Sequence, residues 1–238
     1  PEKIGNLHRL EELYLYNNTL SGSIPAAIFN ISSLQHIELN QNKFSGPIPL
    51  TASNKLSNLE SLLLDDNYLS GVIPSTISNA TKLVFLGLYN NELTGSIPTS
   101  LGSLRNLKFL GLARNKLSSQ SSELSIFTFL TSCRSLTYLV LDNNPLNGFL
   151  PASFSNYSTS LEAISANSCK IKGNIPDGIS NLSSLVLLEF SGNELIGSVP
   201  RTMHSLPNLQ VLYLGSNQIK DVLDIFCGLH SLGLLDLS

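Results

Sequence analysis

The side chains best suited to chemistry in this sequence are few and scattered. Of the four histidines (His8, His36, His204 and His230), only His36 has a carboxylate two residues away on the same strand face, at Glu38. This spacing allows a proton-sensitive pair, and two solvated side chains placed together by coincidence is the alternative. No nucleophile lies beside a base, and no phosphate-binding or zinc-binding motif occurs. The sequence therefore predicts neither an enzyme nor a cofactor or metal site.

An acidic pair, Asp65 and Asp66, falls near the end of a predicted strand. We expect the pair to be exposed. A solvated turn is one interpretation, and a contact for a cation or a peptide is the other.

The three cysteines, Cys133, Cys169 and Cys227, are odd in number and far apart in the chain. A disulfide needs its two Cα atoms within about 7 Å. We therefore expect buried free thiols.

These residues are placed by a repeat that occupies the whole chain. The pattern LxxLxLxxN begins at Leu10 and occurs nine times, and its asparagine positions are spaced by 24, 25, 24, 24, 29, 25, 24 and 24 residues. Each copy supplies one short strand, whose alternate residues, such as Leu13 and Leu15, point inward. Tyr14 and Tyr16 then point to solvent. The strands are expected to stack in parallel, because one copy cannot bury its leucines alone.

The last position of the pattern is expected to form an internal ladder. An asparagine amide both donates and accepts hydrogen bonds, so it can join the backbones of neighbouring turns. A buried thiol can replace it at modest cost. The ladder positions are Asn18, Asn42, Asn67, Asn91, Asn115, Asn144, Cys169, Asn193 and Asn217.

Seven copies continue after the ladder position as L-x-G-x-I-P, as in 20–25 and 93–98. Glycine permits a tight turn and proline ends the extended segment. This combination resembles the plant-specific class of leucine-rich repeats. The resemblance implies an α/β solenoid, a superhelix with a concave parallel sheet, a second sheet on one flank and short helices or 3-10 turns on the convex side. The segments after Asn115 and Asn217 lack the motif, so the second sheet is expected to be interrupted at both.

We expect one leucine-rich-repeat domain over 1–238. It consists of a repeat tail (1–9), copies that start at residues 10, 34, 59, 83, 107, 136, 161, 185 and 209, and a truncated copy (232–238). The sequence begins and ends within a repeat and has no capping units, which solenoids need for solubility. The expectation is an excerpt from a longer extracellular domain.

Composition restricts the partners. Charged residues make up 13% of the chain and the net charge is −3, which argues against nucleic acid and anionic membrane as partners. No run of 18 apolar residues suits a membrane span, so membrane attachment would need segments after residue 238.

Glycosylation sequons favour an extracellular location. N-x-S/T triplets begin at Asn17, Asn30, Asn79, Asn156 and Asn181. All but Asn17 fall 12 residues after a ladder position, hence on one outer flank of the coils. At Asn17, beside the concave face, a glycan would shield that face.

The outward strand residues predict a binding surface on the concave sheet. Phe85, Phe109 and Tyr138 fall on consecutive strands in one column, and exposed aromatic side chains dominate binding hot spots. Gly87 and Gly111 are expected to leave a shallow groove floor beside them. The alternative is a solvated face without a ligand. The expected contact residues are Tyr14, Tyr16, Glu38, Asp65, Phe85, Tyr89, Phe109, Tyr138 and Asp142.

Ten strands would span roughly 45–50 Å, room for about 14 residues of an extended peptide. The acidic residues on this surface favour a peptide or protein ligand that carries a lysine or arginine.

The repeats resemble the ectodomains of plant leucine-rich-repeat receptor-like kinases. The long sixth interval, with residues 123–133, is similar to the extended repeat of the subfamily that includes the receptors for bacterial flagellin and elongation-factor peptides and the rice bacterial-blight receptor. The resemblance implies recognition of a pathogen-derived peptide on the extracellular side of the plasma membrane. It also implies pairing with a co-receptor kinase.

Three alternatives share this repeat. One is a secreted inhibitor similar to the polygalacturonase-inhibiting proteins, whose total of about ten repeats fits this chain less well. The second is a receptor-like protein without a kinase. The third is a scaffold without a ligand.

Overall fold

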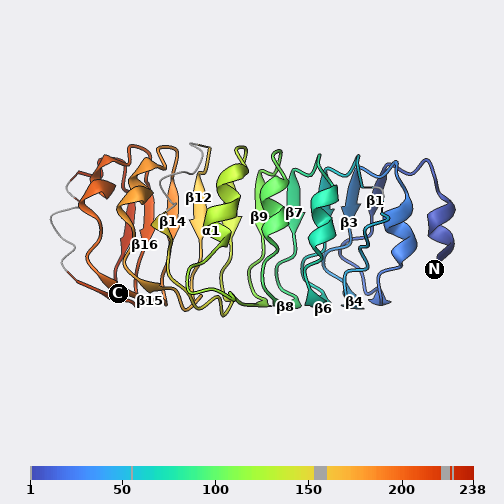
Figure 1. The fold of residues 1–238 in the computed structure, drawn as a ribbon, viewed down its shortest axis with the longest axis horizontal. Coiled ribbons are helices and arrows are strands. Elements are labelled where there is room, and N and C mark those ends of the chain that lie inside the picture. Colours follow the sequence, from blue (N-terminus) through green and yellow to red (C-terminus); the bar gives the residue numbers. More distant parts are fainter. Residues whose placement is uncertain (1, 55, 153–159, 221–225, 227) are drawn as a thin grey trace.

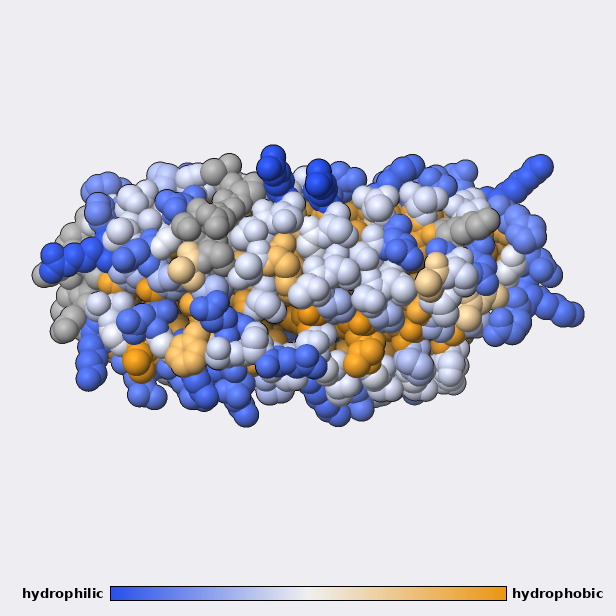
Figure 2. All heavy atoms as spheres, viewed as in Figure 1, coloured by the Kyte–Doolittle hydropathy of each residue, from blue (hydrophilic) through white to orange (hydrophobic). Residues whose placement is uncertain are grey.

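The protein is an elongated stack of coils in which each sequence repeat forms one turn. The computed structural model describes residues 2–54, 56–152, 160–220, 226 and 228–238. The two termini lie at opposite ends of the stack (Figure 1). Seen from one side, hydrophobic residues form a band along its length, between hydrophilic residues that project from both long edges (Figure 2). The buried leucine core is therefore continuous from repeat to repeat.

A ten-stranded parallel sheet lines one face of the stack, as expected from the repeat. Its strands are in register, and the central residue of every strand but the last, such as Leu110, points into the core. Leu235 of the last strand, at the end of the stack, is 39% exposed. The order along the sheet is β1 (Glu12–Tyr14), β3 (His36–Glu38), β5 (Ser61–Leu63), β7 (Phe85–Gly87), β9 (Phe109–Gly111), β11 (Tyr138–Val140), β12 (Ala163–Ser165), β14 (Leu187–Glu189), β16 (Val211–Tyr213) and β18 (Leu234–Asp236).

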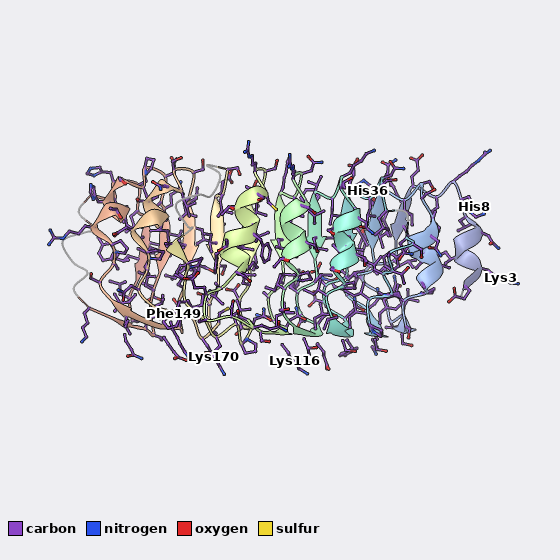
Figure 3. The ribbon with its side chains drawn as sticks, viewed as in Figure 1. Lys3, His8, His36, Lys116, Phe149 and Lys170 are labelled. Atoms are coloured by element: carbon purple, nitrogen blue, oxygen red, sulfur yellow. The ribbon has the colours of Figure 1, made fainter. Side chains whose placement is uncertain are left out.

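A second set of short parallel strands lies along one long edge of the stack, the edge from which Lys116 and Lys170 project in Figure 3. Five strands form its first part: β2 (Ser21–Gly22), β4 (Lys43–Gly46), β6 (Tyr68–Val72), β8 (Glu92–Gly95) and β10 (Lys116–Leu117). Three form its second part: β13 (Lys172–Gly173), β15 (Glu194–Gly197) and β17 (Gln218–Ile219). Strands form after both Asn115 and Asn217, contrary to the prediction that the sheet is interrupted there: β10 pairs with β8, and β17 pairs with β15. The break falls between β10 and β13.

Proline explains the position of this break. In the second copy the Lys43 N–H donates to the Leu20 carbonyl at 2.7 Å and so joins the two strands. Pro145 occupies the equivalent position, one residue after the ladder asparagine, and has no N–H. Here Phe149 forms only isolated bridges, to Glu123 of the preceding copy and to the first residue of β13. The L-x-G-x-I-P motif of this copy is therefore present without a regular strand.

The convex side is built from single helical turns that mostly start after the proline of the motif. These are η2 (Ala26–Asn30), η3 (Ser75–Asn79), η4 (Thr99–Ser103), η7 (Asp177–Asn181) and η8 (Arg201–Ser205), with η1 (Glu2–Asn6) at the start. Proline suits the position before a helix because its φ is fixed and the missing N–H is not needed. The long sixth interval accommodates α1 (Ile126–Phe129) and η5 (Leu130–Ser132). In the described residues no helix has the length and hydropathy needed to cross a membrane.

The ladder asparagines join successive turns through their amides. The Asn115 Nδ2 donates to the carbonyls of Leu112 (3.0 Å) and Ala113 (3.2 Å) in its own turn and to that of Leu88 (2.9 Å) in the preceding turn. Its Oδ1 accepts from the Leu93 N–H at 3.0 Å. The same pattern recurs at Asn42, Asn67, Asn91, Asn144, Asn193 and Asn217. Asn18, in the first copy, bonds only within its own turn.

Cys169 replaces the donor of a ladder asparagine but not its acceptor. Its thiol donates to the Leu141 carbonyl of the preceding turn at 3.3 Å, but it provides no amide oxygen for the Leu146 N–H. That N–H instead donates to the Asn144 carbonyl at 2.8 Å. Cys133 and Cys169 are both buried and free, and burial raises their thiol pKa values to about 11 and about 12. Both thiols are therefore protonated at neutral pH, while Cys227 lies outside the described residues.

Candidate ligand-binding groove

A groove of about 980 Å³ crosses the concave sheet from β1 to β11 and Glu162, the residue before β12. We call it the aromatic groove. Its lining residues are Tyr14, His36, Glu38, Asn40, Ser61, Leu63, Asp65, Phe85, Tyr89, Lys108, Phe109, Thr137, Tyr138 and Glu162. Seven of the nine predicted contact residues are among them. The other two, Tyr16 and Asp142, lie outside it.

Three aromatic residues stand side by side in one column, the one formed by the first residue of each strand. The register of the sheet pairs Phe85 with Phe109 and Phe109 with Tyr138. Phe85 is 46% exposed and Tyr138 is 44% exposed, so both rings face solvent. The Phe109 ring lies over Gly111, where an added Cβ would be 2.8 Å from Phe109 Cε1. The space above Gly111 is thus filled by an aromatic ring, which corrects the expected bare floor at this position.

Asp65 is the largest departure from the expected surface. The exposed acidic pair is wrong for this residue, because Asp65 is only 3% exposed. Its carboxyl lies over Gly87, where an added Cβ would be 2.7 Å from Asp65 Oδ1. The same Oδ1 accepts the Tyr89 N–H at 2.9 Å. Burial raises the pKa of Asp65 to about 7, against the lowering effect of the backbone hydrogen bonds, and Asp66 raises it further.

The end of the groove near β1 is aromatic and partly polar. Tyr14 is 46% exposed, and its ring lies 6.5 Å from that of Tyr16 in an edge-on arrangement and 6.4 Å from that of His36. His36 and Glu38 share the groove, but no hydrogen bond or ion pair joins them within the described part of the chain. His36 and Glu38 therefore do not form a pair in this structure.

Asp142 belongs to a polar network on the later strands. Its Oδ1 accepts from the Ser165 hydroxyl (2.6 Å) and the Asn167 N–H (2.7 Å). Glu189 Oε2 lies 2.5 Å from the same hydroxyl and accepts from Asn167 Nδ2 at 3.1 Å. Sequence reasoning placed Ser165, Asn167 and Glu189 in the outward columns but did not select them, because each is unremarkable until its neighbours on adjacent strands are known. In the described residues, no group of three or more His, Cys, Asp or Glu side chains has the arrangement to hold a metal ion.

Three predicted sequon asparagines occupy equivalent places on the convex side. Asn30, Asn79 and Asn181 are the last residues of η2, η3 and η7, and all three are exposed. Asn30 Oδ1 accepts a hydrogen bond from Asn54 Nδ2 at 2.8 Å, which leaves its own Nδ2 for a glycan. Asn17 is also exposed, at the end of β1, and Asn156 lies outside the described residues.

If the chain is secreted from plant cells, we expect glycans at Asn30, Asn79 and Asn181, since each is an exposed sequon residue at the end of a short convex turn. Peptide mass spectrometry after enzymatic deglycosylation in heavy-oxygen water will detect each site as a labelled aspartate. Asn106 is exposed but has no sequon, and it serves as the internal control. Three unmodified asparagines would contradict the expectation.

Together, the concave parallel sheet and the flanking second sheet define a leucine-rich-repeat solenoid of the plant type, with a groove across several repeats. A model of the leucine-rich repeat region matches residues 1–231, and the chain belongs to the leucine-rich-repeat family.

Its relatives are plant receptors. Receptor-like protein 35 of Arabidopsis thaliana is 39% identical over 94 residues, which is 40% of this chain and 10% of that protein. Receptor kinase-like protein Xa21 of Oryza sativa subsp. japonica is 50% identical over 56 residues, 24% of this chain and 5% of that protein. The structure of the plant peptide hormone receptor RGFR1 in complex with RGF2 superimposes with a TM-score of 0.91 and 34% sequence identity. The superposition covers all of this chain and 37% of the RGFR1 chain. The chain therefore spans at most about two fifths of the length of each of these three proteins.

Proposed function

We propose that this chain is a ligand-recognition segment of a plant cell-surface receptor and binds an extended peptide along the aromatic groove. The observation that carries the proposal is the row formed by Phe85, Phe109 and Tyr138, two of which expose nearly half of their surface in a concavity. Aromatic side chains dominate binding hot spots, and a concave, partly apolar site excludes water around a bound chain.

The relatives support the receptor class. RGFR1, whose fold matches over the full length of this chain, is a peptide hormone receptor, and the sequence relatives are a receptor-like protein and a receptor kinase-like protein. On this proposal the chain faces the outside of the cell. Recognition of a pathogen-derived peptide, pairing with a co-receptor kinase and a kinase domain elsewhere in the protein are further parts of the proposal, and they rest on the family resemblance.

The geometry suits a peptide more than a small metabolite. The aromatic residues of the first column belong to three consecutive strands, and β strands in one sheet lie about 4.8 Å apart. Three strands therefore span roughly 10 Å between their outer members, the length of about three extended residues. Tyr14 and His36 continue the groove three strands further toward the N-terminal end.

Replacing Phe85, Phe109 and Tyr138 together with serine is expected to reduce peptide capture at least 30-fold, because each lost aromatic contact costs about 1 kcal/mol or more. A displayed library of random 14-residue peptides, panned against the immobilised wild-type chain and the triple variant, measures recovery directly.

The matched control replaces Leu187 and Val211 with serine. These residues lie in the same column on β14 and β16, beyond the groove, and are less exposed than Phe85. Circular dichroism and the unfolding midpoint establish that each variant is folded. Equal recovery by the wild type and the folded triple variant would refute binding in the groove.

A further inference from the structure

The floor of the aromatic groove contains a carboxyl group that has no cationic partner. Asp65 lines the groove, although only 3% of its surface is exposed. The glycine at position 87 makes this possible, because any side chain there would occupy the space of the carboxyl. Within the described residues the ion pairs are Lys116–Glu92 and Lys172–Glu194, both on the second sheet. A buried charge without a partner is costly, so this position favours a bound cation.

A second acceptor on the same floor also lacks a donor. Asn40 lies two residues after β3, the position that Asp65 occupies after β5, and it lines the groove. Its Oδ1 atom is buried and has no hydrogen-bond donor in the described part of the chain. A buried amide oxygen without a partner costs about 1–3 kcal/mol. Two neighbouring acceptors on the groove floor thus lack, among the described residues, a cationic or N–H partner that a ligand could supply.

Aromatic rings border these acceptors. Phe85 precedes Gly87 by two residues on β7, and Tyr89 follows it by two, so both stand beside the Asp65 carboxyl and line the groove. An aliphatic stem packs well against such rings, and an ammonium or guanidinium group is attracted to their faces.

We propose that Asp65 and Asn40, together with Phe85 and Tyr89 on the turn after Asp65, form a subsite for the side chain of a lysine or arginine in the peptide ligand. This inference rests on the proposed function and names the side-chain chemistry that the groove selects. The charged head would bond to the Asp65 carboxylate and the Asn40 Oδ1, and its stem would lie against the rings.

Proton competition gives the subsite a defined pH dependence. With a pKa of about 7, the Asp65 carboxyl is mostly neutral at pH 5.5 and mostly charged at pH 8. The other titratable groups around it are Glu38 and His36 on β3, Asp66 in its own turn, Tyr89 in the following turn, and Lys108 before β9. A bound cation requires the charged carboxylate, so preference for a basic side chain increases as the pH rises through 7.

The test is a selection from a random 14-residue peptide library against four forms of the chain at pH 8. The forms are the wild type, Asp65→Asn, the Phe85/Phe109/Tyr138→Ser variant and Asp177→Asn, the last being an exposed carboxylate on the convex side. We expect the wild type and Asp177→Asn to enrich lysine or arginine at one position of the recovered peptides. Asp65→Asn is expected to recover peptides without that enrichment. One recovered lysine peptide and its norleucine version are then compared at pH 5.5 and pH 8, where the lysine preference of the wild type should rise about tenfold or more.

The outcomes separate the two proposals. One outcome is that the Phe85/Phe109/Tyr138→Ser variant (the aromatic variant) recovers few peptides, while Asp65→Asn still enriches lysine or arginine. The groove then binds peptides and the proposed subsite is wrong. If wild-type peptides show no basic enrichment, the subsite is wrong as well. If the aromatic variant and the wild type recover the same basic peptides, the proposed groove itself is wrong. A lysine preference that is equal at both pH values would also overturn the role of Asp65.

Discussion

Replacement of Asn115 with alanine is expected to destabilise the chain by about 3 kcal/mol. The asparagine is 7% exposed, and its amide satisfies the Leu88 carbonyl and the Leu93 N–H of the preceding turn. Alanine would leave the buried Leu93 N–H unpaired, which costs about 1–3 kcal/mol. It would also remove one of the two hydrogen bonds to the Leu88 carbonyl, which still accepts from Asn91 Nδ2 at 3.2 Å. Urea unfolding followed by circular dichroism measures the loss as a lower midpoint.

Two variants control this prediction. Asn18→Ala is expected to cost less than about 1 kcal/mol, because that side chain is exposed and bonds only to its own turn. Asn115→Cys should fall between wild type and Asn115→Ala, since Cys169 donates to the preceding turn in a natural copy. If Asn18→Ala and Asn115→Ala lower the midpoint equally, the bonds between turns are not the source of the effect.

Replacement of Asp65 with asparagine is expected to change the free energy of unfolding, relative to the wild type, more favourably at pH 8 than at pH 4. The difference between the two pH values is at most about 4 kcal/mol. The folded-state pKa of Asp65 is about 7 and the usual value is 3.8. Between these values the folded chain binds more protons at Asp65 than the unfolded chain does. The wild type therefore loses stability as the pH rises from about 4 to about 7, and asparagine removes this loss. Its Oδ1 still accepts from the Tyr89 N–H.

The measurement is the difference in unfolding midpoint between wild type and Asp65→Asn at several pH values, in which titrations common to both proteins cancel. Asp66→Asn serves as the local control, because Asp66 is the neighbouring residue and is more exposed. A wild-type to Asp65→Asn difference that stays constant from pH 4 to pH 8 would contradict a raised pKa.

Much of the architecture follows from the sequence because the repeat fixes it locally. The inward leucines, the outward columns and the ladder positions depend only on the place of a residue within its own turn, and neighbouring turns are alike. The pairing of Phe85, Phe109 and Tyr138 followed from that phase alone.

The remaining features depend on which residues meet across turns. Asp65 is buried because the following copy has Gly87 beneath its carboxyl, and the residues of its own copy give no sign of this. Likewise, the break in the second sheet was assigned to segments that lack the L-x-G-x-I-P motif. The N–H missing at Pro145 decides it instead, in a copy that has the motif. Sequence patterns describe each turn well, whereas these exceptions arise between turns.

The in-register concave sheet imposes a mismatch of periods on any extended ligand that runs along it. Successive strands lie about 4.8 Å apart, while side chains on one face of an extended peptide recur about every 6.7 Å. Three strand steps, roughly 14 Å, nearly equal two such peptide steps, roughly 13 Å. The strand spacing and the side-chain spacing coincide about once in every three repeats. Ligand residues about four positions apart therefore meet equivalent positions of the sheet.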